Sequence, residues 1–184
     1  VTEAVSEDDV EPVAEVADLL QIGSRTMHSP GLLRRVAAAG KPVLLKRGMA
    51  ATLVEWLLAA ETCLLHGAPA VVLCERGVRG YDSSARNLLD VAAVALMRMQ
   101  YGLPVIVDPS HAAGRRDLVV PLGRAALAAG ASGLLVEVHN APGLARSDGP
   151  QALAPEAVSA EQVAAVAAEF FAPERQTVVR LGPS

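Results

Sequence analysis

The chain has 184 residues, of which 52% are hydrophobic and 20% are charged, and its formal net charge is −4. This composition can fill the core of one compact domain and is not that of a disordered chain. The negative charge gives no general attraction to nucleic acid or to an anionic membrane, so an anionic ligand would need a local cluster of cations. The composition therefore predicts a globular protein with no nucleic-acid or membrane partner.

Neither the cysteines nor the N-terminal residues suggest export. Cys63 and Cys74 are the only cysteines, and both lie in apolar stretches without the spacing of a metal site. Two such thiols are typical of a reduced, cytoplasmic protein. The opening residues, VTEAVSEDDVEP, are acidic, unlike a signal peptide, and no apolar run approaches the ~18 residues of a membrane span. We therefore expect a cytoplasmic location.

Short apolar runs recur along the chain, each too short for a buried helix and rich in Leu or β-branched residues. They are DLLQIG from Asp18, PVLLKRG from Pro42, AVVLCERG from Ala70, LPVIVDPSH from Leu103 and GLLVEVH from Gly133. Apolar residues are continuous in these runs and do not alternate with polar ones. This pattern predicts parallel strands that are covered on both faces.

Helical patterns separate these runs. The expected helices span 31–39, 52–66, 88–100, 117–129 and 159–171. The second begins with Thr52 and has Glu55 three residues later, which predicts a capping box, and Gly67 ends it. The alternation of strands and helices predicts an α/β fold with a parallel sheet, which is either an open doubly wound sheet or part of a (β/α) barrel.

Polar side chains of functional types follow nearly every predicted strand. They are Gln21, Ser24, Arg25, Lys46, Arg47, Glu75, Arg76, Asp108, His111, Glu137 and His139. An open sheet concentrates its site at one switch point, whereas a barrel collects chemistry at the C-terminal ends of all its strands. The chain also lacks a GxGxxG or Walker pattern. These observations favour the barrel.

Three cations, Arg25, Lys46 and Arg76, follow three consecutive predicted strands. In a barrel these strand ends converge, so the three side chains could surround one small anion. Arginine offers forked hydrogen bonds to phosphate or carboxylate, and lysine offers a compact charge. Any one of them alone would more simply be a loop residue paired with an acid. Their common register favours an anion site.

A second set of strand-end residues could bind a metal. His111, Glu137 and Asp148 supply one imidazole and two carboxylates, which suits a divalent Mn, Fe, Co or Zn ion. His139 is a competing ligand, because Glu137 and His139 point the same way along a strand. The spacing is not a local metal motif, and a lone strand-end histidine is more often structural. Spacing alone therefore leaves both interpretations open.

Several other residues are expected to be structural. Trp56 and Met97 lie at helical positions that predict packing, and His66 suits the negative end of a helix. Arg115 and Arg116 are expected at a solvated helix entrance.

A series of motifs follows the predicted strands in chain order. They are QIGSR (21–25), PVLLKRG (42–48), LCERG (73–77), ARNLLD (85–90), VIVDPSH (105–111), GLLVEVH (133–139) and SDGPQ (147–151). Together they resemble the type I 3-deoxy-D-arabino-heptulosonate 7-phosphate (DAHP) synthases of the beta subgroup. The resemblance covers roughly residues 1–155. It implies a (β/α)8 TIM barrel that condenses phosphoenolpyruvate with erythrose 4-phosphate, using a divalent metal. This reaction is the first step of the shikimate pathway, which leads to chorismate and the aromatic amino acids.

The resemblance also implies roles for individual residues. The residues that match the phosphoenolpyruvate site are Ser24, Arg25, Lys46 and Arg76. Those that match three of the four metal ligands are His111, Glu137 and Asp148. Asp108 matches an acid near the sugar phosphate, and the implied catalytic residues are Lys46, Asp108 and His111.

The chain also departs from this family. The family's barrel begins with a GPCS-type cysteine, the fourth metal ligand, and its second strand ends in a KPRTS-type motif that contacts erythrose 4-phosphate. Neither motif occurs here, and Cys63, within a predicted helix, and Cys74, within a predicted strand, cannot substitute. We therefore expect residues 1–172 to form an incomplete barrel, from about strand 3 to helix 8, that lacks the first two βα units. Residues 173–184 are expected to form a C-terminal tail.

The departure leaves alternatives. The chain is either a fragment or a natural short protein, and alone it is expected to bind phosphoenolpyruvate and metal weakly with little or no turnover. A complete protein is expected to be a homo-oligomer. One alternative is a non-catalytic or regulatory partner that docks on a full-length synthase. Another is a 3-deoxy-manno-octulosonate 8-phosphate synthase. That family has a QIPAF-type motif where this chain has QIGSR, and it lacks the LKRG motif. A third is a different aldolase-type barrel enzyme.

Overall fold

A computed structural model describes residues 1–155 of the protein. The helix expected at 159–171 and the boundary expected between 172 and 173 lie outside these residues. The described part forms one six-stranded sheet with the order β1-β2-β3-β4-β5-β6, and all neighbouring strands are parallel. Each strand therefore pairs with the next one along the chain, with no reversal of order. This is the strand order of a (β/α) barrel and not of a doubly wound sheet.

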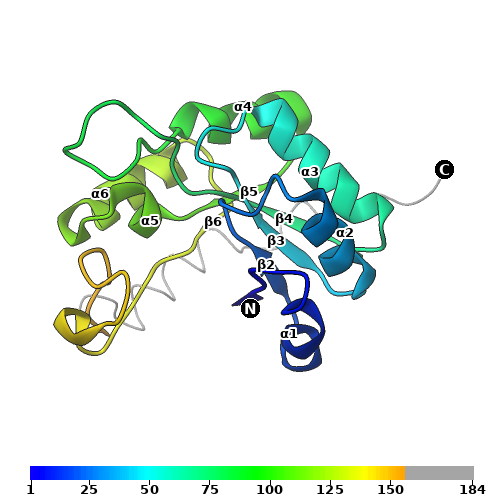
Figure 1. The fold of residues 1–184 in the computed structure, drawn as a ribbon. Coiled ribbons are helices and arrows are strands. Elements are labelled where there is room, and N and C mark those ends of the chain that lie inside the picture. Colours follow the sequence, from blue (N-terminus) through cyan, green and yellow to red (C-terminus); the bar gives the residue numbers. More distant parts are fainter. Residues whose placement is uncertain (156–184) are drawn as a thin grey trace.

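All the predicted strands are present. The six strands are β1 Thr2–Glu3, β2 Leu20–Ile22, β3 Val43–Lys46, β4 Val71–Glu75, β5 Val105–Val107 and β6 Gly133–Leu134. Within residues 1–155, β1 and β6 form the two ends of the sheet, so the barrel is incomplete there, as predicted. Figure 1 shows the strands at the centre and the helices around them.

The helices are α1 Val10–Val16, α2 Pro30–Ala38, α3 Leu53–Leu65, α4 Val91–Tyr101, α5 Pro109–Ala113 and α6 Arg116–Ala128, with a 3₁₀ turn at Pro142–Leu144. Two of these helices were not predicted: α1, in which Val10 alone is buried, and α5, which is too short to show a helical period. None of the described helices is both long and apolar enough to pass through a membrane.

The ends of the helices follow local side-chain chemistry. The predicted capping box of α3 is confirmed, because Thr52 Oγ1 accepts the Glu55 N–H at 3.2 Å and Glu55 Oε2 accepts the Thr52 N–H at 2.7 Å. Helix α4 begins at Val91 and not at the predicted Leu88. Leu88 is held in a β-bridge with Val78, and the Asp90 side chain caps the helix by accepting the Ala93 N–H at 2.9 Å.

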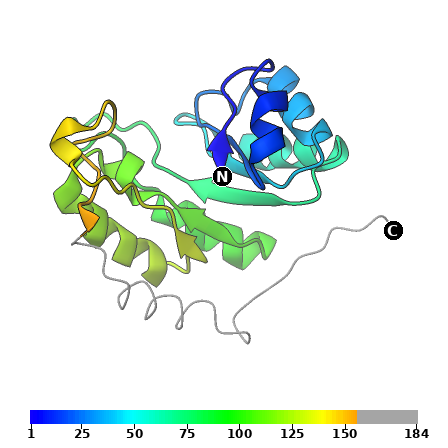
Figure 2. The same ribbon diagram turned by 90° about the horizontal axis from the view of Figure 1, so that it is seen from below.

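The core lies between the sheet and the helices that surround it. Figure 2 shows the blue-to-cyan helices α1–α3 beside one part of the sheet and the green helices α4–α6 beside the other. Trp56 of α3 is 0% exposed, and its indole N–H donates to the Leu45 carbonyl of β3 at 3.2 Å. The expected packing role of Trp56 and Met97 is confirmed, since both are fully buried. This core fixes the strands whose C-terminal ends carry the polar residues.

We expect Trp56→Ala to lower the free energy of unfolding by about 3–5 kcal/mol, the usual cost of emptying a large aromatic site in a core. Urea unfolding followed by circular dichroism measures this loss. Val54→Ala is the matched control on the same helix, because Val54 is 59% exposed. Its effect should stay within about 0.5 kcal/mol. Equal losses in the two variants would contradict the assigned packing.

Candidate metal and anion site

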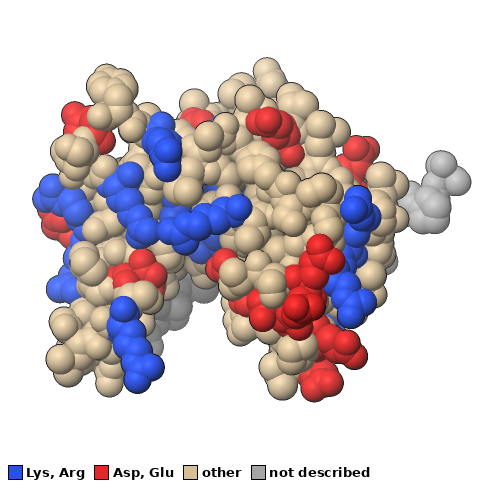
Figure 3. All heavy atoms as spheres, in the orientation of Figure 1, with Lys and Arg blue, Asp and Glu red and all other residues tan. Residues whose placement is uncertain are grey.

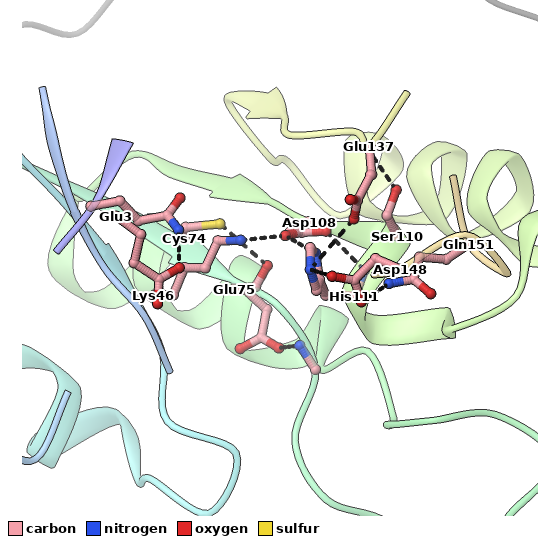
Figure 4. A network of polar contacts seen from close by, with 12 residues as sticks. Glu3, Lys46, Cys74, Glu75, Asp108, Ser110, His111, Glu137, Asp148 and Gln151 are labelled. Carbon is pink, nitrogen blue, oxygen red and sulfur yellow. Dashed lines mark hydrogen bonds and ion pairs between the residues drawn. The ribbon is translucent and has the colours of Figure 1, made fainter. Parts of the chain in front are cut away.

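Asp108 follows β5 directly and is the central carboxylate of the site. It is 1% exposed, and its Oδ1 accepts the backbone N–H of His111 at 2.9 Å, which caps α5. Its Oδ2 accepts a hydrogen bond from the Lys46 ammonium at 2.7 Å and lies 2.8 Å from His111 Nδ1 (Figure 4). Because a carboxylate can only accept, Nδ1 is the ring nitrogen that donates, so in the neutral ring the lone pair lies on His111 Nε2.

That lone pair faces two carboxylates. His111 Nε2 is 3.5 Å from Glu137 Oε2 and 3.8 Å from Asp148 Oδ2, and the candidate ligand atoms all lie within 4.8 Å of one another (Figure 4). The structure therefore brings together the three predicted metal-site residues. The competing candidate, His139, is not in this group, and its Nδ1 accepts the Ala141 N–H at 3.0 Å.

The donor set fits a divalent cation. Glu137 Oε2 is buried and has no hydrogen-bond partner in the described residues, an uncommon and costly state for a carboxylate oxygen. Burial and the neighbouring Asp148 carboxylate raise the pKa of Glu137, whereas His111 lowers it. A cation between one imidazole and two carboxylates would bind the unpaired oxygen and offset the repulsion between the two carboxylates. This mixture of ligands suits Mn, Fe, Co or Zn.

The positions of Glu137 and Asp148 depend on contacts from two other elements. Ser110 of α5 is 0% exposed, and its hydroxyl accepts the backbone N–H of Glu137 at 3.1 Å. Arg116 donates through its guanidinium to the carbonyls of Gly149, at 3.0 Å, and Ala152, which flank the Asp148 turn. Arg115 and Arg116 lie exposed at the start of α6, as expected, and Arg116 in addition holds the turn that carries Asp148.

The predicted cations lie in different environments. Lys46 and Arg76 are 6% and 4% exposed, whereas Arg25 is exposed and Ser24, in the same loop, is half-buried. Lys46 is already paired with a carboxylate. Arg76 Nη1, in contrast, is buried with no hydrogen-bond partner in the described part of the chain. Figure 3 shows basic side chains gathered in a band that runs from the left of the view to about its centre.

A further arginine lies beside this group. Burial lowers the pKa of Arg76, and the positive charges of Arg86 and Arg25 lower it further, while the Asp108 carboxylate raises it. Several cations therefore lie near one another around a buried and unpaired guanidinium, which favours an anionic ligand. No role was predicted for Arg86 from the sequence, although this residue lies in the ARNLLD motif.

Two further strand-end charges, Arg47 and Glu75, are buried and form an ion-pair network with Asp90, the cap of α4. Arg47 Nη1 lies 3.0 Å from Glu75 Oε2 and 2.9 Å from Asp90 Oδ2, so this arginine is not free for a ligand. Glu75 Oε1 also accepts the Gly77 N–H at 2.6 Å. Gly77 has φ +91°, and a Cβ there would come within 2.8 Å of the Asn87 Cβ. The network therefore fixes the backbone on either side of Arg76.

Both cysteines are buried and free. Burial raises the pKa of the Cys63 thiol to about 11 and also raises the pKa of the Cys74 thiol. Neither belongs to the group of candidate metal ligands found among the described residues. Cys63 lies in α3 and Cys74 in β4, as expected.

Known proteins resemble this chain over most of its length. The model of the DAHP synthetase I family matches residues 1–169. Phospho-2-dehydro-3-deoxyheptonate aldolase of Thermotoga maritima is 52% identical over 153 residues, which are 83% of this chain and 45% of that protein. A 2-dehydro-3-deoxyphosphooctonate aldolase of Acidithiobacillus ferrooxidans is 38% identical over 83% of this chain and 57% of that protein.

Solved structures give the same result. A truncated form of 3-deoxy-D-arabino-heptulosonate 7-phosphate synthase from Thermotoga maritima matches with a TM-score of 0.86 and 46% identity, over 92% of this chain and 66% of that one. A crystal structure of Phospho-2-dehydro-3-deoxyheptonate aldolase (DAHP synthase) from the same organism matches with the same TM-score and identity. This match covers 92% of this chain and 51% of that one. The chain thus spans about half the length of the curated relatives it matches.

We expect Asp108→Asn to be less stable than the wild type by about 3 kcal/mol at pH 6, because it leaves the buried Lys46 ammonium without its carboxylate. Burial raises the pKa of Asp108, but the hydrogen bond from His111 and the Lys46 charge outweigh it and lower the pKa to about 2. The ionised form therefore contributes about 2 kcal/mol that is present above about pH 4 and is lost as the pH falls toward 2.

Urea unfolding of both proteins between pH 6 and pH 3 measures this effect. The difference in stability between wild type and Asp108→Asn should begin to narrow below about pH 4. A difference that stays constant over this range would show that the Asp108 charge contributes nothing.

Proposed function

The chain belongs to the DAHP synthetase I family, and on this premise we propose that it carries the phosphoenolpyruvate- and metal-binding part of a 3-deoxy-7-phosphoheptulonate synthase. The complete reaction is the condensation of phosphoenolpyruvate with erythrose 4-phosphate. The observation that carries the proposal is the buried, unpaired Arg76 guanidinium at the same strand ends as His111, Glu137 and Asp148. Anion-binding and metal-binding groups therefore share one mouth of the barrel.

Phosphoenolpyruvate has a phosphate and a carboxylate, which require donors from more than one direction. Arg76 extends from the end of β4, while Arg25 and the Ser24 hydroxyl belong to the loop after β2. Lys46 has three N–H donors, of which Asp108 takes one, so the others remain available to a ligand. These groups would neutralise the ligand and hold it in one orientation before the reaction begins.

His111 Nε2, Glu137 and Asp148 are the residues that would hold the divalent ion. When bound, such an ion supplies Lewis acidity, which polarises a carbonyl or activates a water molecule. Asp108 holds the His111 ring by accepting from Nδ1, which fixes the ring orientation and makes Nε2 the nitrogen that faces the ion. Its role in this proposal is to orient His111 and neutralise Lys46.

A 3-deoxy-octulosonate 8-phosphate synthase activity is the alternative on the same fold. The octulosonate relative from Acidithiobacillus is 38% identical, whereas the heptulosonate relative from Thermotoga is 52% identical over the same share of the chain. This difference supports the heptulosonate reaction.

Arg76→Met tests the anion site. Calorimetric titration with phosphoenolpyruvate in the presence of Mn²⁺ should give an affinity at least about tenfold lower than that of the wild type, because hydrogen bonds to charged groups contribute about 1.5–3 kcal/mol. Arg98→Met is the matched control, since Arg98 bonds only the Gly130 carbonyl among the contacts of the described residues. An unchanged affinity in Arg76→Met would exclude Arg76 from the site.

A steady-state assay with both substrates and added Mn²⁺ tests the activity of the chain itself. We expect phosphoenolpyruvate binding with little or no turnover, since the candidate metal group in the described residues has three members and no cysteine. Turnover comparable to that of a full-length relative would contradict this expectation.

A further inference from the structure

The two oxygens of the Asp148 carboxylate have different surroundings. Oδ1 accepts hydrogen bonds from Arg86 Nη1, at 3.2 Å, and from Gln151 Nε2. Oδ2 faces His111 Nε2 at 3.8 Å. Asp148 is also the one non-glycine residue among residues 1–155 with a positive φ, +60°, so its backbone is in a conformation that most side chains avoid. The carboxylate is therefore held in one orientation by donors on one oxygen only.

Arg86 is itself fixed against the helix that carries His111. Its backbone N–H donates to the Ala113 carbonyl at 3.0 Å, and the Asn87 side chain donates to the His111 carbonyl at 3.0 Å. The approach is so close that a Cβ on Gly114 would lie 2.5 Å from the Arg86 Cβ, and Gly114 has φ +64°. The segment 86–87 therefore contacts two of the three candidate metal ligands.

We infer that Arg86, together with Gln151, is a positioning residue for the metal site, which leaves Oδ2 of Asp148 as the oxygen that faces the ion. This inference rests on the proposed function, because it requires that His111, Glu137 and Asp148 bind a divalent cation. Arg86 does not touch the ion and acts through the Asp148 carboxylate. The side chain of Gln151 supports the same oxygen from the other direction, and it is 2% exposed.

Charge and positioning make opposite predictions for the loss of Arg86. A guanidinium near a divalent cation repels it, so removing the positive charge would by itself tighten metal binding. Removing a donor that orients a ligand weakens metal binding, commonly by about 10- to 100-fold for such outer partners. The sign of the change in affinity therefore separates the two effects.

The experiment is a Mn²⁺ titration of the full chain, in which electron paramagnetic resonance counts the free aqueous ion. We expect Arg86→Met to bind Mn²⁺ about tenfold more weakly than the wild type. Arg86→Lys keeps the charge but loses the forked donor, and should recover part of the affinity. Arg98→Met makes the same chemical change at an arginine that donates to the Gly130 carbonyl, at 3.2 Å, and should bind Mn²⁺ like the wild type.

Gln151→Leu is the second variant, because it removes the other donor to Oδ1 without changing the charge. It should also weaken Mn²⁺ binding, and it decides the question if circular dichroism shows that Arg86→Met does not fold. If the wild type binds Mn²⁺ and a folded Arg86→Met binds it equally or more tightly, the positioning role of Arg86 is overturned. An unchanged Mn²⁺ affinity in a folded Gln151→Leu would likewise overturn the inference. Either result would leave the proposed metal site in place. A wild-type chain that binds no Mn²⁺ would overturn the proposed metal site as well.

Discussion

The site depends on one buried carboxylate that serves three donors. Asp108 accepts hydrogen bonds from the Lys46 ammonium, the His111 ring and the His111 backbone N–H, and its side chain is almost completely buried. Burial alone would favour the neutral acid, so the ionised form exists only because these donors surround it. Its charge also makes burial of Lys46 possible. The anion-binding and metal-binding sides of the site are thus joined through a single side chain.

The short helix α5 organises the residues around this carboxylate. Asp108 caps it, Ser110 holds the backbone of Glu137, and His111 presents Nε2 to the two carboxylates. The carbonyl groups at its C-terminal end accept from the segment that carries Arg86. A five-residue helix has no stability of its own in water. Its conformation therefore comes from the cap and from contacts with β5, α6 and the loop between β4 and α4.

The charged groups at the strand ends divide into structural and available ones. Arg47 and Glu75 are buried and form a network with the partly exposed Asp90, and satisfied pairs of this kind fix a backbone without binding ligands. Arg76 lies beside this network, with a guanidinium nitrogen that is buried and unpaired. Because an unpaired buried charge raises the free energy of the folded protein, an anion bound to Arg76 would stabilise this arrangement.

The sequence by itself determined the strands, the main helices, their parallel order and the set of polar residues at the strand ends, because these follow from local periodicity, caps and glycines. The spacing of His111, Glu137 and Asp148 left a metal site undecided, and the family resemblance was needed to favour it. Only the tertiary structure showed that His139 is outside the group and that Arg116 holds the Asp148 turn.

The tertiary structure also decided which strand-end cations are free. Lys46, Arg47 and Arg76 look alike in the sequence, but Arg47 is occupied by two carboxylates, Lys46 gives one donor to Asp108, and Arg76 retains an unpaired nitrogen. Helix α5 is too short to show a helical period, although Asp108, Pro109 and Gly114 are local start and stop signals. The role of Arg86 depends on its contact with Asp148, far along the chain, and a pairing of this kind leaves no local pattern. Local chemistry therefore set the elements, and the packing of the strand ends set the site.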